Sequence, residues 1–374
     1  MKRKSHIISL YNMHSSGSWV ILSALLESFP RYFPDALFIL PSTCPRNYFN
    51  EQNTQPLFLS IPTSKIGRIL HSFFIDQFLI PLLAVGVGAK EIIHFGNVAS
   101  YIAPCCQRVF FHNALFLPIY PLNSMPNAYL KLQRHYVLLS LLFSKSTLLV
   151  QNQYMKSQFQ LKKEFKNLKV YSIGNPFKND TQTNESPLKS RNLEIIKKYD
   201  GIKSHFKYIA LYPSFPHSYK DHHFLLAQAE YLALKSIHVV FTCSHTSLGL
   251  TAEIEDNGLS GVFSFLGSLN QSELECLYQI SDLILFPSRV ESLGMPIIEA
   301  AIYKKPLLVP ALPYALSSVT NAYFYETYSN YSSFNFTLAC NQLVKDLEHK
   351  VAKIPIPIIN TSPHNFLESL RDLK

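Results

Sequence analysis

Short apolar runs alternate with longer amphipathic stretches along most of the chain, and this alternation restricts the fold more than any other feature. In the first half the apolar runs predict buried strands at Ile7–Tyr11, Ala36–Leu40, Leu57–Ile61, Glu91–Phe95, Arg108–His112 and Thr147–Gln151. Helical patterns such as Trp19–Phe29 and Leu130–Leu142 lie between them. Strands that alternate with helices in this way pack as a parallel sheet with helices on both faces.

The pattern stops at Asn175–Pro176 and is followed by the polar, turn-rich stretch Phe177–Arg191, where we expect a hinge. Further strands are then predicted at Lys207–Tyr212, Ile237–Cys243, Gly261–Leu266, Leu283–Pro287 and Pro306–Pro310. The sequence therefore predicts two doubly wound Rossmann-like domains, residues 1–175 and 176–355, facing a central cleft. A tail, residues 356–374, is expected to carry a helix that crosses back to the first domain. Ligands of such sheets bind at the carboxyl ends of the strands.

Composition narrows the class of protein and of partner. The chain has 374 residues, of which 47% are hydrophobic and only 16% charged, so a largely disordered chain is excluded. Residues 1–172 carry 17 Lys and Arg against 6 Asp and Glu, whereas the remainder is slightly acidic. The basic half suits an anionic acceptor or a phospholipid surface, with simple solubility as the alternative. No nucleic-acid-binding signature is present, so nucleic acid is not expected as a partner.

Cysteine spacing and hydropathy predict a cytoplasmic location. No Cys-x-x-Cys pair occurs, and Cys243 and Cys276 lie in apolar surroundings typical of buried thiols. The apolar stretch near the N-terminus is too short for a signal peptide. Phe73–Val87 is the most apolar segment, and we expect it to be a buried helix, with contact at a membrane interface as the alternative.

The most informative stretch is Ser281–Ala300, SDLILFPSRVESLGMPIIEA. Its pattern predicts a strand, then a loop containing Gly294, then a helix with Pro296 in its first turn. Free backbone N–H groups and the positive end of the helix dipole would favour a diphosphate at this loop. Glu291 and Glu299 are acceptors suited to hydroxyl groups of a sugar and a ribose.

This stretch resembles the fingerprint of the family 4 retaining glycosyltransferases, which have the two-domain GT-B fold. The resemblance rests on Phe286–Pro287–Ser288 followed by two glutamates, Glu291 and Glu299, at the Glu-x7-Glu spacing. It implies that Glu291 contacts the donor sugar and Glu299 the ribose. It also implies that the loop contacts the sugar and phosphates through Ser292, Leu293, Gly294 and Met295. The alternative is a structural role, with Glu291 as a partner of the helix dipole and Glu299 as a solvated residue.

The segment Tyr212–His222 resembles the family's diphosphate clamp, in which an arginine and a lysine neutralise the donor. Lys220 matches the lysine. The arginine is missing, because Ser214, His217 and Ser218 occupy the candidate positions. We expect Ser214 and His217 to take part in donor binding, His217 carrying a positive charge if the diphosphate raises its pKa. Absence of an Asp-x-Asp motif predicts no essential metal and no cofactor besides the nucleoside diphosphate sugar substrate.

In the N-terminal half the candidates follow predicted strands. Gly17, after the first strand, resembles the turn by which family members approach the donor phosphates, although an ordinary strand–helix turn explains it equally well. His112 is the candidate catalytic residue beside the sugar, with a buried core histidine as the alternative. The candidates on the acceptor side are Asn97, Asn113 and Arg134.

The sequence thus predicts a retaining hexosyltransferase that uses a nucleoside diphosphate sugar and a glycan or lipid-linked acceptor. The resemblance is to bacterial enzymes of surface-polysaccharide and lipopolysaccharide synthesis, with His112, Lys220 and Glu291 as catalytic residues. A cytoplasmic protein is expected, with peripheral contact at the inner face of the plasma membrane left open. A nucleotide-sugar epimerase and a non-catalytic nucleotide-sugar- or glycan-binding protein of the same fold are the alternatives.

Overall fold

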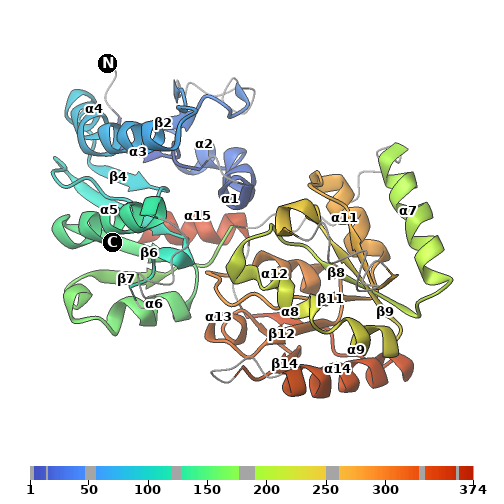
Figure 1. Cartoon of the computed structure of the whole chain (residues 1–374). Helices are drawn as coiled ribbons and strands as arrows, with labels where there is room; N and C mark the ends of the chain where they lie inside the picture. The colour runs from blue at the N-terminus through green and yellow to red at the C-terminus, as the bar shows by residue number, and fades with distance from the viewer. Residues whose placement is uncertain are drawn as a thin grey trace. The chain divides into compact units, whose positions relative to one another are not determined.

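The computed structural model describes residues 4–13, 16–46, 56–118, 128–176, 190–249, 261–327, 333–358 and 362–373. The chain forms two compact units (Figure 1). Unit 1 comprises residues 1–179 and 359–374, and unit 2 comprises residues 180–358. Of the expected hinge region, Phe177–Arg191, residues 177–189 lie outside the described residues and the last two residues begin the first helix of unit 2.

Unit 1 contains a parallel sheet in the order β3-β2-β1-β4-β5-β6-β7. Its strands are β1 (His6–Ser9), β2 (Ala36–Pro41), β3 (Leu57–Leu59), β4 (Glu91–His94), β5 (Cys106–Phe111), β6 (Ser146–Val150) and β7 (Lys169–Ser172). Between the strands lie α1 (Ser16–Leu26), α2 (Phe29–Tyr32), α3 (Lys65–Phe74), the π-helix η2 (Ile75–Leu79), α4 (Ile80–Val87), the short 3-10 helix η3 (Ala114–Phe116), α5 (Ala128–Phe143), α6 (Gln153–Gln160) and η5 (Lys163–Phe165). The strand interiors are apolar because helices cover both faces of the sheet.

Unit 2 repeats this architecture with the sheet order β10-β9-β8-β11-β12-β14. Its strands are β8 (Tyr208–Tyr212), β9 (Ile237–Phe241), β10 (Phe263–Phe265), β11 (Leu283–Leu285), β12 (Leu307–Pro310) and β14 (Tyr323–Tyr325), and β13 (Val319–Thr320) pairs separately with β15 (Ile356–Pro357). The helical segments are α7 (Ser190–Lys203), η6 (Ser218–Lys220), α8 (His222–Leu226), α9 (Ala229–Leu234), η7 (Thr246–Leu248), α11 (Gln271–Ile280), α12 (Met295–Ile302), α13 (Pro313–Leu316) and α14 (Ser333–Glu348). The two doubly wound sheets confirm the predicted fold class.

The last helix, α15 (Pro363–Asp372), packs in unit 1 although it follows unit 2 in the sequence. Phe366, Leu367 and Leu370 are buried in the core cluster of unit 1. The ring of Phe366 lies 5.2 Å from that of Phe110, in edge-to-face contact. The chain therefore returns to the first sheet after completing the second.

The sequence prediction missed four strands, β7, β14 and the short pair β13 and β15. Each is an edge strand of its sheet and pairs on one side only. Edge strands are often short, but the edge strands β3 and β10 were predicted from their apolar runs, so position at an edge does not alone explain the omission.

The prediction that Phe73–Val87 is helical is confirmed, but the prediction that this helix is buried is wrong. The segment is helical through α3, η2 and α4, but Phe74, Phe78 and Leu82 are 55%, 50% and 69% exposed. Only the opposite side packs on the sheet, through Ile75, Ile80, Ala84 and Val87. The run Ile66–Val87 has 22 residues and a mean hydropathy of 1.7. By length and composition alone, it could cross a membrane.

Asp76 is a buried carboxyl group in η2, on the side that faces the sheet. Its Oδ2 atom accepts hydrogen bonds from Ser72 Oγ at 3.0 Å and Asn12 Nδ2 at 3.3 Å. Burial raises the pKa of Asp76 to about 7, and the two hydrogen bonds oppose that shift. The folded protein therefore binds a proton here at pH values at which the unfolded chain has released it.

This raised pKa predicts that the free energy of unfolding falls as the pH rises from the ordinary Asp value to about 7, because the folded state holds the extra proton in that window. The Asp76→Asn variant has no carboxyl group at this position, so it does not pay the free energy of ionising a buried carboxyl group in the folded state. We expect the variant to be more stable than the wild type at pH 8, by about 1–3 kcal/mol, and to differ little from it at about pH 4, where the unfolded chain still holds much of the proton. Thermal melts at both pH values measure this. Equal shifts at the two pH values would contradict it.

Candidate functional site

The sheet of unit 2 reverses its winding between β8 and β11, which are neighbours. From β8 the chain builds outward to β9 and β10, whereas β11, β12 and β14 lie on the other side. Loops that follow two such strands diverge and leave a crevice for a ligand. The loop after β8 carries Lys220, and the loop after β11 carries Glu291, so the two most specific sequence motifs meet at this switch point.

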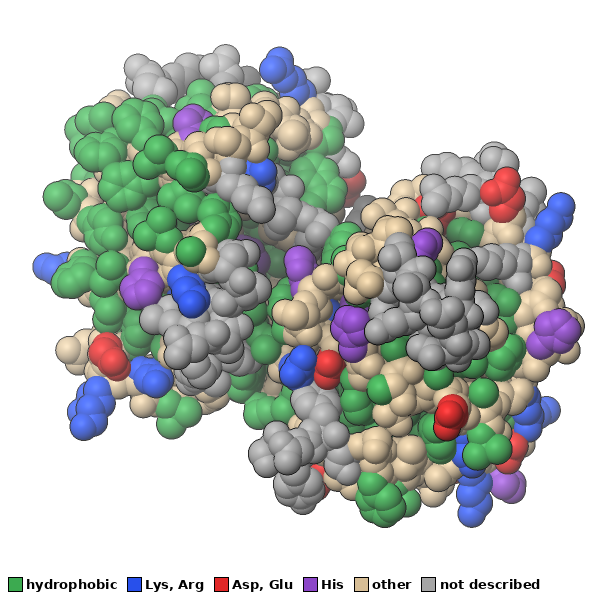
Figure 2. Space-filling model, viewed as in Figure 1, with side chains coloured by type: hydrophobic (Ala, Val, Ile, Leu, Met, Phe, Trp, Pro, Cys, Tyr) green, Lys and Arg blue, Asp and Glu red, His purple; other side chains and the backbone are tan. Residues whose placement is uncertain are grey.

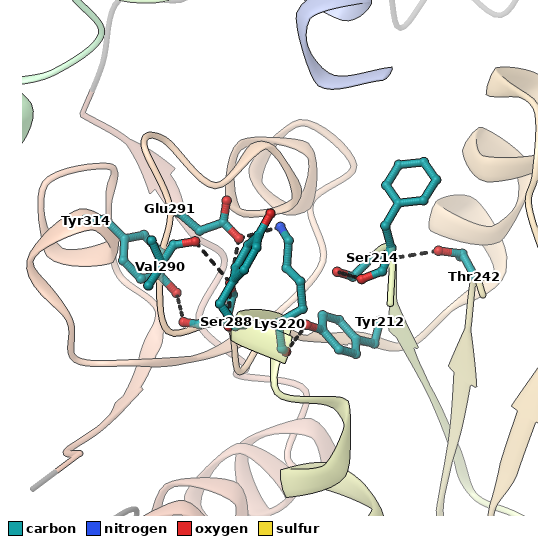
Figure 3. Close-up of polar contacts among 10 residues, drawn as sticks. Tyr212, Ser214, Lys220, Thr242, Ser288, Val290, Glu291 and Tyr314 are labelled. Carbon is teal, nitrogen blue, oxygen red and sulfur yellow. Dashed lines mark hydrogen bonds and ion pairs between the residues drawn. The ribbon is translucent and has the colours of Figure 1, made fainter. Parts of the chain in front are cut away.

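Lys220 and Glu291 form a direct ion pair (Figure 3). Lys220 Nζ lies 2.5 Å from Glu291 Oε1, and the two side chains are only 14% and 13% exposed. Ser288 Oγ donates a hydrogen bond to the same carboxylate oxygen at 2.6 Å. The Lys220 ammonium also lies 5.3 Å from the centre of the Phe286 ring. One cation and one anion, both largely shielded from water, thus sit at the carboxyl ends of adjacent strands.

Two tyrosines that the sequence prediction missed fix the backbone of these loops. Tyr212 OH donates a hydrogen bond to the carbonyl of Lys220, and Tyr314 OH donates one to the carbonyl of Ser288 at 2.5 Å. The backbone N–H of Arg289 donates to the carbonyl of Tyr219 at 2.8 Å and ties one loop to the other. The loops are therefore held before any ligand binds. Tyr212 ends a predicted strand, which is the one signal that pointed to it.

Ser214 and His217 lie on the same loop as Lys220, but they are held within the protein. The backbone N–H of Ser214 donates to Thr242 Oγ1 at 3.0 Å, and its hydroxyl donates to the carbonyl of Phe215. The His217 ring stacks on Tyr219 at 5.3 Å. Burial, and then the charge of Lys220, lower the pKa of His217. The ring is therefore neutral at pH 7 in the protein alone.

Arg289 is a second cation that the sequence prediction missed. It lies in the loop after β11, and its guanidinium contacts the turn that carries Lys220. Arg289 Nη2 donates to the carbonyl of Ser218 at 3.3 Å and lies 3.3 Å from Asp221 Oδ1. An arginine therefore contacts the turn after β8, but it comes from the loop after β11 and not from the loop that carries Lys220.

The loop after β11 ends at Gly294, which adopts a left-handed conformation with φ +71° at the start of α12. A Cβ atom at this position would lie 2.9 Å from Ile297 Cδ1, so glycine fits both the backbone and the space. The Leu293 carbonyl accepts a hydrogen bond from Ser318 Oγ at 2.9 Å. Ser292 and Met295 flank these two residues, so the backbone of the expected donor loop leads directly into the helix N-terminus.

Glu299 lies within α12 and is buried, so it is not a solvated helix residue. Tyr278 OH, from α11, donates a hydrogen bond to Glu299 Oε2 at 2.5 Å. Burial raises the pKa of Glu299, and the Tyr278 hydrogen bond opposes that shift. Glu299 is thus held by Tyr278 of α11 and takes no part in the Lys220–Glu291 ion pair.

Unit 1 has a polar cavity of about 290 Å³ at its own switch point, between β1 and β4. Residues that follow β1, β4 and β5 line it, together with α3 and α5. The lining residues include Asn12, Arg68, Ser72, Gly96, Asn97, His112, Asn113, Tyr129, Gln133 and Tyr136. Gly96 lets the loops approach, because a Cβ there would lie 2.6 Å from Asn12 Nδ2.

The structure brings His112, Asn97 and Asn113 together at this cavity. Asn97 Oδ1 accepts the backbone N–H of His112 at 2.8 Å and that of Asn113 at 3.2 Å, so Asn97 positions the loop that carries His112. Asn113 Oδ1 accepts the N–H of Leu115. Burial lowers the pKa of His112 to about 4, against the effect of the Phe110 backbone. The imidazole is therefore neutral at pH 7 and faces a polar cavity.

The remaining two candidates lie elsewhere in unit 1. Arg134 is buried, is not among the lining residues, and donates through Nη2 to the carbonyls of Leu117 and Pro118 at 3.0 and 3.1 Å. It holds the chain before α5. Gly17 lies in the first turn of α1, next to residues 14–15, which are outside the described residues. Within the described ranges, no group of three His, Cys, Asp or Glu residues is arranged to hold a metal ion.

Residues 194–350 match the family model described as "Glycosyl transferases group 1". No curated protein sequence matches the chain.

Several solved structures share the fold over nearly the whole chain. HepE of Anabaena, solved with UDP and glucose, has a TM-score of 0.62 at 15% identity, with 99% of this chain and 95% of that chain covered. A glycosyltransferase from Rickettsia africae gives 0.62 at 16% identity, covering 99% and 97%. WaaG, a glycosyltransferase involved in lipopolysaccharide biosynthesis, gives 0.62 at 13% identity, covering 99% and 96%.

The family match covers the sheet and loops that carry Lys220, Glu291 and Glu299, and the fold matches over both units. The chain thus has the GT-B fold and is a glycosyltransferase, and residues 194–350 are similar to the group 1 members of that class.

Proposed function

We propose that the protein is a retaining hexosyltransferase that transfers a sugar from a nucleoside diphosphate sugar to a glycan or lipid-linked acceptor. The observation that carries the proposal is the shielded Lys220–Glu291 pair at the switch point of unit 2, beside the Gly294 turn that begins α12. The protein would act in the cytoplasm, in the synthesis of a cell-surface polysaccharide. The similarity in fold to WaaG supports that assignment.

In this proposal Lys220 leaves Glu291 when donor binds. Its ammonium then faces the diphosphate, whose negative charge grows as the glycosidic bond breaks, so the cation stabilises the transition state more than the bound substrate. Glu291 is thereby freed to accept hydrogen bonds from the donor-sugar hydroxyls. The pair thus holds both groups in place without donor, and each has a substrate partner when donor is bound.

The remaining donor contacts follow from the same loops. Backbone N–H groups of Gly294 and Met295 at the start of α12 would face the phosphates, where the helix dipole favours negative charge. Glu299, steadied by Tyr278, would accept a ribose hydroxyl. Arg289 would take the place of the arginine missing from the loop after β8, by moving from Asp221 toward the diphosphate. Neutral His112 in unit 1 would hydrogen-bond to the sugar without adding charge.

We expect Lys220→Ala and Glu291→Gln each to lower kcat/KM for donor by about 10²–10³, the former through lost charge stabilisation and the latter through a lost hydroxyl acceptor. Lys207→Ala is the matched control, because Lys207 forms an exposed ion pair with Glu348. Initial rates with a series of nucleoside diphosphate sugars and a membrane extract as acceptor measure this. Full activity of Lys220→Ala would overturn the assigned site.

The stereochemical part of the proposal is tested separately. We expect the anomeric carbon of the transferred sugar to keep its configuration, which NMR of the product shows directly. An inverted product would contradict a retaining mechanism but not sugar transfer. Conversion of donor without any acceptor would indicate an epimerase, and donor binding without turnover would indicate a binding protein.

A further inference from the structure

Unit 1 exposes an unusually apolar face, which we call the apolar face. It is formed by α3, η2, α4 and α5, and Figure 2 shows hydrophobic side chains gathered over the part of unit 1 that carries these helices. The side chains of this face are large and hydrophobic, yet each is exposed to solvent. They are Ile66, Leu70, Phe73, Phe74, Phe78, Leu82 and Val85 from the first three helices and Leu132, Leu139, Leu142 and Phe143 from α5.

The two helical segments form one continuous surface. The ring of Phe73 lies 5.5 Å from that of Tyr136, which joins α3 to α5, and Gln77 donates a hydrogen bond to Tyr136 OH. Phe74 stacks on Phe78 at 5.9 Å along the same surface. Contiguous apolar patches of this kind are rare on soluble monomers and mark a surface that contacts a partner.

The charge around the apolar face favours an anionic lipid surface over a protein partner of mixed charge. Within α3, η2, α4 and α5 the described acidic residue is Asp76, which is buried. Lysines lie within or next to these helices: Lys131 in α5, and Lys90 and Lys145 just beyond the ends of α4 and α5. Apolar side chains ringed by Lys and Arg are typical of segments that lie in the interface of an anionic bilayer.

The same two helices also line the polar cavity at the switch point of unit 1. Arg68 and Ser72 of α3 and Tyr129 and Gln133 of α5 face the cavity, while neighbouring turns present the apolar face. The cavity offers amide and hydroxyl groups together with one guanidinium. This combination suits a hydroxylated head group that carries a phosphate. A polar pocket and a lipid-compatible surface therefore share α3 and α5.

We propose that unit 1 lies on an anionic lipid bilayer through the apolar face and takes the polar head of a lipid-linked acceptor into the adjoining cavity. The acceptor half of this proposal rests on the proposed function. The helical run would lie on the bilayer and not cross it, because Ile75, Ile80, Ala84 and Val87 pack in the core beneath the sheet.

The first test measures vesicle binding without any donor, so that it does not depend on catalysis. The full chain is sedimented with vesicles of phosphatidylethanolamine and phosphatidylglycerol. Phe74→Ser/Phe78→Ser should bind at least about tenfold more weakly, because two exposed rings no longer enter the interface. The control is Leu234→Ser/Leu338→Ser, two exposed leucines of unit 2. Equal binding by wild type and Phe74→Ser/Phe78→Ser, or none by wild type, would overturn membrane docking.

Two further measurements test the alternatives to surface docking, a helix that crosses the bilayer and a second copy of the chain on the apolar face. Alkaline carbonate should release the wild type from vesicles, whereas retention would contradict a helix that lies on the surface. Sedimentation velocity should give the same molecular mass for wild type and Phe74→Ser/Phe78→Ser. A dimer in wild type that is lost in this variant would assign the face to a second copy of the chain instead.

The acceptor half is tested with Gln133→Ala, which alters the cavity and not the apolar face. We expect normal vesicle binding but at least tenfold lower kcat/KM with a lipid extract as acceptor. Phe74→Ser/Phe78→Ser should lose turnover with the extract and bind UDP or GDP as tightly as the wild type. Unchanged turnover of the extract by both variants would overturn a lipid-linked acceptor. Absence of turnover in the wild type would count against the proposed function, and the vesicle result would still stand.

Discussion

The parallel pairing of the strands is the constraint on which the rest of this structure depends. In a parallel sheet every strand ends at the same edge, so residues far apart in sequence meet wherever two neighbouring strands stop. In unit 2 this places Lys220 and Glu291 in contact, although 71 positions separate them. In unit 1 it places Asn12, Asn97 and His112 around one cavity. Both groups of residues lie where their sheet reverses its winding.

The sequence was most informative where a local pattern determines local structure. Central strands such as β8 and β11 read as continuous apolar runs because helices cover both of their faces. The turn at Gly294 and the helix after it followed from the order of strand, loop and Pro296. The fold class and the region of the donor loops were therefore predictable, whereas the short strands β7 and β14 were missed.

The contacts within the site depend on tertiary packing, and the sequence did not reveal them. No spacing predicts that Tyr314 donates to the carbonyl of Ser288 or that Arg289 lies against the turn after β8. The same holds for α3, η2 and α4. A segment that is apolar on every side reads as buried, and only the packed structure shows that one side meets the sheet while Phe74, Phe78 and Leu82 remain exposed. Its hydropathy was visible in the sequence, but its orientation was not.

The two units thus carry different polar sites, a shielded ion pair in unit 2 and a polar cavity bordered by apolar helices in unit 1. The central claim is that a nucleoside diphosphate binds at the switch point of unit 2. Hydrogen exchange of the full chain, with and without UDP or GDP, tests it directly. The account predicts slower exchange in peptides covering residues 213–221 and 286–299, with the rest of unit 2 unchanged. Protection confined to unit 1, or none in these two loops with any nucleotide that binds, would contradict it.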